Sequence, residues 1–246
     1  MARGALVGAC VFCAPMLCAG DAFAGRPFIT DDASVVGRGV LQLEAWLRLE
    51  EGMIQQWTVA AVGPLGPLEI SAGIAAALAS TDGWEPRVAG AIGQLKALVL
   101  EPRPAGIPGI AGVIAVFPPA GSGSFATESW HAASYAALTA LPFANERWAI
   151  HANLGVALAT NESLQAGPYW ALGTSVEIVE GLDVMGEVFS AEPAEDARIG
   201  ATQVGLIVAF NEHVQLDGTF GGVVWGDDQP EVFATAGVKL ASGELW

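Results

Sequence analysis

The sequence predicts an all-β protein, a closed antiparallel transmembrane β-barrel of about twelve strands. Three observations lead to this prediction. Long stretches alternate between apolar and other residues, which is the pattern of a strand with two different faces. The chain is 52% hydrophobic and only 15% charged, against about 25% charged in an average soluble domain. The connections between the predicted strands are mostly short at one end and longer at the other, as in transmembrane barrels.

The clearest alternation runs from Arg147 to Ala159. One parity of this stretch carries Arg147, His151 and Asn153 together with small residues. The alternation lasts about a dozen residues, longer than the five or six of a typical strand and long enough for a tilted strand to cross a bilayer. We infer that the other parity faces lipid, and its members are Trp148, Ile150, Ala152, Leu154, Val156 and Leu158.

The first 24 residues predict a secretory signal peptide that is removed on export. Arg3 supplies the positive start, residues 6–17 form an apolar core, and Ala22-Phe23-Ala24 has small residues at both ends of a cleavage site. We therefore expect three parts: a signal peptide at 1–24, a periplasmic N-terminal segment at 25–38 and a barrel at 39–246.

All three cysteines, Cys10, Cys13 and Cys18, lie in the predicted signal peptide. A lipoprotein signal with Cys18 as the lipidated residue is the alternative, but Leu17 stands where such a signal needs a small residue. With the signal removed, the mature chain has no thiol for a disulfide, a thiolate metal site or a nucleophile.

Composition also limits the environment and the partners. No run of 18 apolar residues follows the signal, which argues against membrane helices, and only a closed barrel then satisfies the backbone hydrogen bonds in a bilayer. The net charge of −16 and the pI of about 4.3 argue against a nucleic-acid partner, because phosphate binding needs clustered Lys and Arg. We expect location in the outer membrane of a Gram-negative bacterium.

A short motif precedes the first strand. Arg26-Pro27-Phe28-Ile29-Thr30-Asp31-Asp32-Ala33 is followed by Gly37-Arg38-Gly39 and a strand that contains Leu43-Glu44. Through Arg26, Pro27, Thr30, Asp31 and Asp32, this stretch resembles the start of the mature chain in the family labelled "MetA-pathway of phenol degradation". The resemblance covers residues 26–44 and implies an outer-membrane barrel with a transport role. The family label comes from genetic context, and no residue here selects phenol.

The adjacent carboxylates Asp31 and Asp32 have two interpretations. They could form a metal or substrate site, but a carboxylate pair after Thr30 more often forms a turn or a cap.

Alternation and turn residues predict twelve strands, an even number as bacterial barrels require. The first hairpin, at Glu51-Gly52-Met53, departs from the pattern of connections, and the strand at 107–117 is apolar on both parities. The predicted short connections are 63–66, 102–106, 143–145, Gly181 and Glu212. The predicted strands are 39–50, 54–62, 67–79, 86–100, 107–117, 130–142, 146–159, 168–180, 182–191, 199–211, 213–225 and 231–241.

If the apolar parities face lipid, the opposite parities line the lumen. Together with Glu50, the lumen-lining residues named below include seven carboxylates and four Lys or Arg side chains. This excess of carboxylates predicts a mild preference for cations or neutral solutes. Such groups can also pair across a narrow barrel and fill it, so a plugged lumen stays an alternative. The predicted lumen-lining residues are Glu44, Arg48, Glu69, Lys96, Arg147, His151, Glu177, Asp183, Glu187, Asp217 and Lys239.

Aromatic residues are expected at the membrane interfaces. Trp246, which follows the last amphipathic strand, resembles the terminal aromatic that the barrel-assembly machinery recognises, although Gly243-Glu244 interrupts the alternation. The predicted girdle consists of Trp84, Trp130, Trp148, Trp170 and Trp225.

Two other classes of protein fit less well. A membrane-embedded lipid hydrolase needs a Ser–His pair oriented by a third group. Parts of such a catalytic site are supplied by Ser129 or Ser134 with His131, and by His151 with Asn153. No Gly-x-Ser-x-Gly context surrounds either serine. A soluble barrel that carries an apolar ligand would reverse the two faces and would need a more polar exterior. No spacing of the histidines supports a metal site, so no catalytic residue, cofactor or metal is expected.

We therefore expect a monomeric barrel that acts as a passive pore or facilitator for small molecules, including aromatic or hydrophobic ones. The expected partners are outer-membrane lipid and lipopolysaccharide, the barrel-assembly machinery during biogenesis and a small-molecule solute. A structural or plugged barrel without transport is the alternative.

Overall fold

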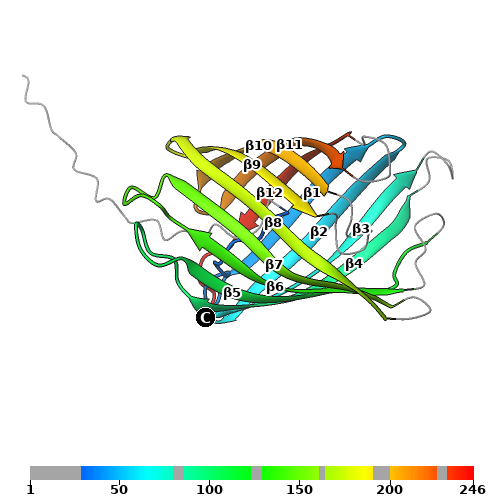
Figure 1. The fold of residues 1–246 in the computed structure, drawn as a ribbon, viewed down its shortest axis with the longest axis horizontal. Helices are drawn as coiled ribbons and strands as arrows, with labels where there is room; N and C mark the ends of the chain where they lie inside the picture. The colour runs from blue at the N-terminus through cyan, green and yellow to red at the C-terminus, as the bar shows by residue number, and fades with distance from the viewer. Residues whose placement is uncertain (1–28, 80–85, 123–128, 161–163, 191–199, 226–231) are drawn as a thin grey trace, which may run out of the picture.

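The computed structural model describes residues 29–79, 86–122, 129–160, 164–190, 200–225 and 232–246. The predicted signal peptide, Arg26, Pro27 and Trp84 lie outside these residues. Within them, twelve strands form one closed antiparallel barrel (Figure 1), which confirms the predicted fold class. A search of the same residues finds no helix long and apolar enough to cross a membrane.

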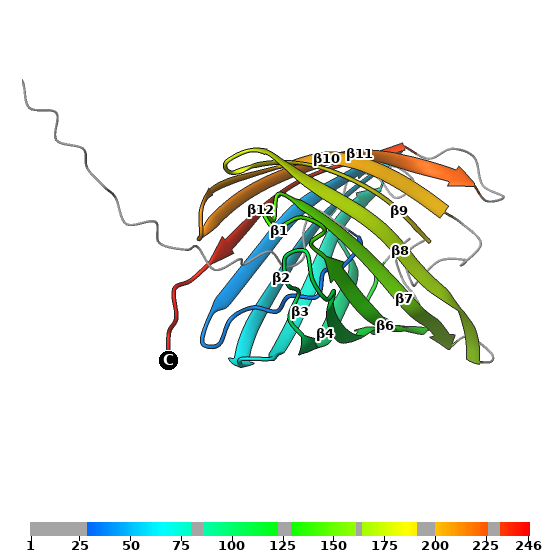
Figure 2. The same ribbon diagram turned by 60° about the vertical axis from the view of Figure 1, so that its left-hand side comes forward.

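Each strand pairs with its neighbours in the chain, and β12 closes the barrel by pairing with β1. The short connections such as the one between β8 and β9 lie at the same end as the C-terminus (Figure 2). The strands are β1 (Leu41–Glu50), β2 (Met53–Leu65), β3 (Leu68–Ala79), β4 (Arg87–Leu100), β5 (Gly109–Phe117), β6 (Trp130–Ala140), β7 (Trp148–Thr160), β8 (Leu164–Val179), β9 (Leu182–Ser190), β10 (Gly200–Asn211), β11 (Val214–Trp225) and β12 (Val232–Ala241).

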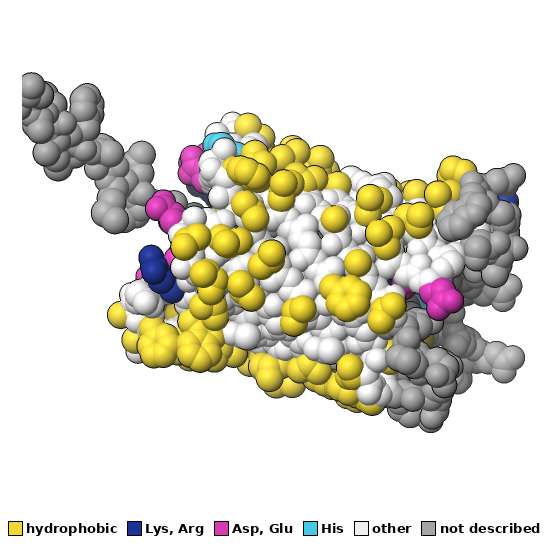
Figure 3. Space-filling model, turned by 90° about the horizontal axis from the view of Figure 1, so that it is seen from above, with side chains coloured by type: hydrophobic (Ala, Val, Ile, Leu, Met, Phe, Trp, Pro, Cys, Tyr) yellow, Lys and Arg dark blue, Asp and Glu magenta, His cyan; other side chains and the backbone are white. Residues whose placement is uncertain are grey.

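The two faces of the strands differ as the alternation predicts. On β11, Leu216 and Phe220 are exposed on the outside, whereas Gln215, Asp217 and Thr219 are buried on the inside. Apolar side chains are spread over the outer surface (Figure 3). An apolar outer surface is typical of a barrel that faces lipid. The soluble carrier would have its apolar face inside, so that alternative is wrong for this chain.

The beginning of β8 departs from the prediction. The strand starts at Leu164 and not at residue 168, so Pro168 lies within it and pairs with β7. The backbone nitrogen of Pro168 points toward β9, on the same side of the strand as the backbone N–H of Trp170. The Trp170 N–H donates to Ser190 Oγ at 3.2 Å. This side lies beyond the last pair of the β8–β9 ladder, Ala171 with Phe189. The missing N–H of proline therefore costs no ladder bond there.

The end of β2 departs in the same way. β2 continues to Leu65, so Gly63 belongs to the strand and not to a turn. Gly63 accepts a hydrogen bond from Gly39 N at 2.8 Å and donates one to Val40 O at 3.2 Å. A Cβ at position 63 would lie 2.2 Å from the carbonyl oxygen of Gly37. Only glycine allows the chain that precedes β1 to approach β2 this closely.

Three of the predicted girdle tryptophans, Trp130, Trp148 and Trp225, are exposed at strand ends. Trp225 also stacks on Trp170, with ring centroids 5.8 Å apart. Trp148 lies against Phe143 at the opposite end of the barrel. This arrangement is that of aromatic residues at two membrane interfaces.

Candidate functional site: the barrel lumen

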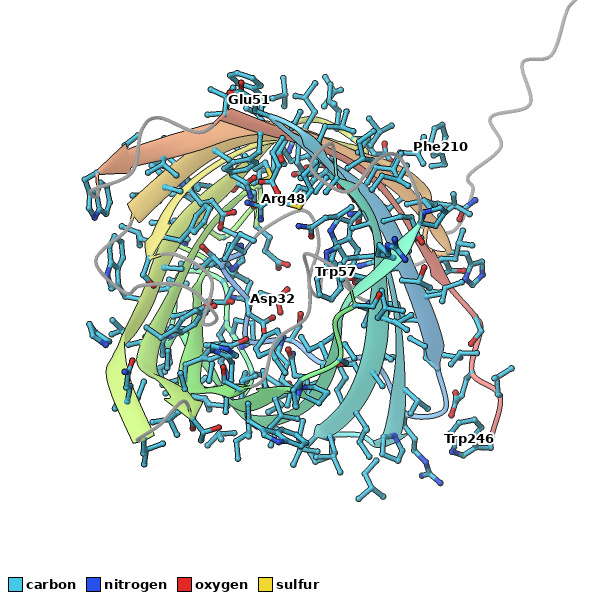
Figure 4. All side chains as sticks on the ribbon, turned by 90° about the vertical axis from the view of Figure 1, so that its right-hand side faces the viewer. Asp32, Arg48, Glu51, Trp57, Phe210 and Trp246 are labelled. Carbon is cyan, nitrogen blue, oxygen red and sulfur yellow. The ribbon has the colours of Figure 1, made fainter. Side chains whose placement is uncertain are left out.

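Residues 29–38, which we call the inner segment, lie inside the barrel. The segment leads to Gly39 and from there into β1 at the end that carries the short connections (Figure 2). Asp32 lies within the ring of strands when the barrel is viewed along its length (Figure 4). The sequence predicts a periplasmic segment at 25–38, and the structure places the described part of that segment in the lumen.

Glu187 on β9 holds the beginning of the inner segment. Its Oε1 accepts the Ile29 N–H at 2.8 Å, and its Oε2 accepts the Thr30 N–H at 2.7 Å and the Thr30 hydroxyl at 2.5 Å. Gln203 on β10 donates a further hydrogen bond to Oε1. Glu187 is only 5% exposed. A buried carboxylate is tolerated when several donors satisfy it, and here the backbone of the segment supplies two of them.

Asn153 on β7 makes a reciprocal pair of hydrogen bonds with the segment. Asp31 N donates to Asn153 Oδ1 at 2.7 Å, and Asn153 Nδ2 donates to the Asp31 carbonyl at 2.8 Å. Further along, Ala33 N donates to Thr139 Oγ1 on β6 at 2.8 Å. His151 Nδ1 lies 3.0 Å from the same hydroxyl. The predicted lumen residue His151 therefore lies next to the hydroxyl that holds the segment.

Lys96 on β4 binds both carboxylates of the motif. Its Nζ lies 2.6 Å from Asp31 Oδ1 and 3.1 Å from Asp32 Oδ1. Asp31 also accepts a hydrogen bond from the Tyr135 hydroxyl at 3.2 Å. Asp32 Oδ1 accepts the Ser34 N–H and hydroxyl at 2.8 Å each, which is the turn geometry expected for aspartate. The turn interpretation accounts for Asp32, but sequence reasoning missed the pairing with Lys96.

A metal site is not what this arrangement supplies. The ammonium of Lys96 takes the position between the two carboxylates that a cation would need. Among the described residues, no group of three or more His, Cys, Asp or Glu side chains could hold a metal ion.

Apolar contacts complete the docking of the inner segment. Ala33 is fully buried in one cluster with Ala111 and Val113 of β5 and Ala137 of β6. These contacts explain why β5 is apolar on both parities: its inner face is covered by protein and not by water. Near the other end of the segment, Val36 N donates to Glu69 Oε2 on β3 at 2.8 Å.

The hydrogen bonds given above between the inner segment and the wall go to β3, β4, β6, β7 and β9. The opposite part of the wall consists of β11, β12, β1 and β2, and it carries further predicted lumen residues. Glu44 lies opposite Lys239 in the register of β1 and β12. The carboxylate of Asp217 lies over Gly237, where a Cβ would approach both oxygens to 3.0 Å.

An aromatic pair stands on this opposite wall. Trp46 of β1 and Trp57 of β2 face each other in register, with ring centroids 5.7 Å apart and ring planes 9° apart. Arg48 forms an ion pair with Glu50 at 3.2 Å, and its guanidinium lies 4.9 Å above the Phe233 ring. Figure 4 shows Arg48 and Trp57 inside the ring of strands and Phe210 outside it. Trp46 has the same parity as the predicted lumen residues Glu44 and Arg48, whereas no sequence pattern indicated Trp57.

Three predicted lumen residues lie near the rim where the short connections are. Arg147 Nε is 3.3 Å from Glu177 Oε2, and the Arg147 side chain is 56% exposed. Asp183 is the register partner of Glu177 across β8 and β9. These residues are thus separate from the inner segment.

Ser134, one of the two serines of the hydrolase alternative, does not meet His131 on β6. Ser134 is exposed on the outer face, beside Ile114 and Val156. His131 has the opposite parity and points inward, so it cannot activate Ser134.

Two solved structures share this architecture. The KdgM porin has a TM-score of 0.59 at 9% sequence identity, and the match covers 81% of this chain and 98% of that chain. The NanC porin has a TM-score of 0.57 at 8% identity, with the same coverage. At this identity the likeness shows the outer-membrane barrel fold alone. No curated protein matches the chain. Residues 24–240 match the family described as "Putative MetA-pathway of phenol degradation", and the chain belongs to that family.

Proposed function

We propose that this protein is a passive outer-membrane channel for small molecules. The observation that carries the proposal is the distribution of residues over the barrel. Apolar side chains cover the outside, and the inner wall of β1 presents the partly exposed side chains of Glu44 and Arg48. Ionisable groups on an inner wall serve a water-filled passage, because they stay hydrated there and act on a passing solute.

The passage proposed here lies between the inner segment and the wall formed by β11, β12, β1 and β2. The segment is hydrogen-bonded to the other side of the lumen through Glu187, Asn153 and Lys96. It therefore narrows the lumen from one side, and the solute faces Asp32 on one side and the indoles of Trp46 and Trp57 on the other.

The solute class proposed is a small cation or neutral molecule with a flat aromatic group. Glu44 gives the wall a partly exposed carboxylate, and the electron-rich ring faces of Trp46 and Trp57 attract both aromatic rings and organic cations. The indole pair is partly exposed, so ring surface remains for a solute to touch.

A plugged barrel without transport is the second candidate, and the inner segment is the specific observation that favours it. Five backbone N–H groups of the segment, those of Ile29, Thr30, Asp31, Ala33 and Val36, are bonded to side chains of the wall. A segment tied this firmly could close the lumen completely.

The proposal also covers export, membrane insertion and partners. We propose that residues 1–24 direct export and are removed, and that the barrel-assembly machinery inserts the chain. The mature protein then works as a monomer in contact with outer-membrane lipid and lipopolysaccharide, with no cofactor and no nucleic-acid partner.

The test is single-channel recording of the protein purified from outer membranes, in planar bilayers with a KCl gradient. We expect discrete current steps with a cation preference that falls in Glu44→Gln. Glu212→Gln is the matched control, because Glu212 is 67% exposed in the β10–β11 turn and pairs with His213. A protein that inserts into the bilayer and never conducts contradicts the channel and favours the plugged barrel.

A further inference from the structure

The inner segment and the barrel are held together in different ways. The barrel is closed by continuous backbone ladders, including the β1–β12 seam from Gln42–Ala241 to Glu50–Phe233. The segment pairs with a strand only at its end, where Arg38 bridges Gly63. Its backbone contacts with the rest of the wall are hydrogen bonds to side chains, such as those of Glu187, Asn153 and Glu69. Losing them leaves every ladder of the barrel intact.

The wall groups that hold the segment are also groups that water can satisfy. Glu187, Asn153, Thr139, Glu69 and Lys96 are all charged or polar. If the segment leaves, these side chains line the lumen and become hydrated, which avoids the cost of an unpaired buried polar group. The segment itself contributes few buried apolar side chains: Ala33 and Val36 are buried, and Ile29 packs against a second apolar cluster.

The C-terminal end of the segment is fixed in place. Gly39 has a φ of 73°, its N–H donates to Gly63 O at 2.8 Å, and its carbonyl accepts the Leu245 N–H at 2.9 Å. A left-handed backbone favours glycine, so position 39 is a defined bend between the segment and β1. The segment can therefore leave the wall while it stays attached at this point.

We propose that the inner segment is a docked strap that leaves the lumen wall as one unit while the barrel stays closed. In the docked state the strap narrows the passage, and in the released state the lumen is wider. The side chains of Glu187, at one end of the strap, and of Lys96, in its middle, hold the strap in the docked state. This inference rests on the proposed channel function for its effect on current, but the movement of the strap is measurable without any current.

The first experiment reads the movement directly. Ala33 is fully buried against Ala137, so an Ala33→Cys thiol is protected from a membrane-impermeant methanethiosulfonate reagent while the strap is docked. We expect slow labelling in the otherwise unchanged chain and labelling about tenfold faster when Glu187→Gln is added, because hydrogen bonds to a charged acceptor are lost. Glu212→Gln is the control and leaves the rate unchanged. Equal rates in all three proteins overturn the proposal.

The second experiment locks the strap. The double variant Ala33→Cys/Ala137→Cys is oxidised with copper phenanthroline, which accepts the two electrons as the thiols form a disulfide. We expect the oxidised protein to lose the larger of its conductance levels and to regain it in dithiothreitol, with oxidised wild type as the control for effects of the oxidant alone. If the protein conducts, a disulfide that forms without changing the conductance levels overturns the proposal. A failure to form the disulfide also overturns it, since Ala33 would then not lie against Ala137.

The two readouts separate the inference from the proposed function. If no variant conducts while labelling at position 33 still depends on Glu187, the channel function fails and the movable strap stands. If the protein conducts while labelling is independent of Glu187, the channel stands and the strap fails.

Discussion

The ammonium of Lys96 lies 2.6 Å from Asp31 Oδ1 and 3.1 Å from Asp32 Oδ1. One cation on β4 thus neutralises two carboxylates that belong to a segment more than sixty residues earlier in the chain. Lys96 is only 1% exposed, so the three charges depend on one another for compensation. This contact turns a short sequence motif into an element of the barrel interior.

Lys96→Met tests how much this contact stabilises the docked segment. The substitution removes the cation and leaves two carboxylates uncompensated, a change that typically costs about 3 kcal/mol or more when the pair is buried. We expect the free energy of unfolding, measured by urea titration in detergent micelles with tryptophan fluorescence, to fall by about that amount.

Arg147→Met is the matched control for that measurement. The Arg147–Glu177 ion pair is partly exposed at the rim, and exposed pairs contribute about 0–1 kcal/mol. Equal losses in the two variants would show that Lys96 does not hold a buried cluster.

Ala33→Leu tests the packing of the segment against the wall. Ala33 is fully buried against Ala111, Val113 and Ala137, and the added carbons do not fit, at a typical cost of about 1–3 kcal/mol. We expect the segment to leave the wall more often, so that the mean single-channel conductance rises. Ala72→Leu, on the exposed outer face of β3, is the control, and an unchanged conductance in both variants contradicts the packing.

Gly155→Ala tests the close approach of β6 and β7. A Cβ at Gly155 would lie 2.1 Å from Ser134 O and 2.5 Å from Tyr135 Cβ. The substitution must displace Tyr135, whose hydroxyl donates to Asp31, and we expect a loss of about 1–3 kcal/mol in unfolding free energy. At Gly112 a Cβ meets no atom within 4 Å, so Gly112→Ala should be neutral. A neutral Gly155→Ala would mean that the two strands are not this close.

Trp46→Leu tests the aromatic solute site. The permeability ratio of benzyltrimethylammonium to tetramethylammonium, taken from reversal potentials, isolates the effect of the aromatic ring. We expect this ratio to fall about two- to fivefold, which corresponds to ~0.5–1 kcal/mol of cation–π and ring contact. Trp148→Leu changes an indole on the outer face of the barrel, against Phe143 at the end with the short connections, and leaves the ratio unchanged. The same fall in both variants would place the effect outside the lumen.

The strands could be predicted because lipid and lumen impose opposite demands on alternate residues. Leu216 and Asp217 are neighbours in the chain and lie on different faces, as the alternation predicts. The start of β8 could not be predicted, because Pro168 and the preceding Gly167 are typical of a loop. Their position in a strand depends on where β9 ends, which is a tertiary fact.

The inner segment was beyond local reasoning for a related reason. Nothing near Thr30 or Asp31 indicates that their partners are Glu187, Asn153 and Lys96, since these contacts span 65 to 157 residues. One signal was present: the stretch 107–117 is apolar on both parities. A strand whose inner face is apolar in a polar lumen must have that face covered by protein, and Ala33 covers it.

The measurement that tests the account most directly compares thiol reactivity on the two sides of the lumen. Thr235 on β12 belongs to the part of the wall opposite the segment, where it is partly exposed. Ala111 on β5 belongs to the wall under the segment, where it is fully buried. The account predicts that a water-soluble thiol reagent modifies Thr235→Cys quickly and reduces the current, and modifies Ala111→Cys slowly. Equal fast reaction at both positions contradicts a docked segment, and no reaction at either contradicts a water-filled passage.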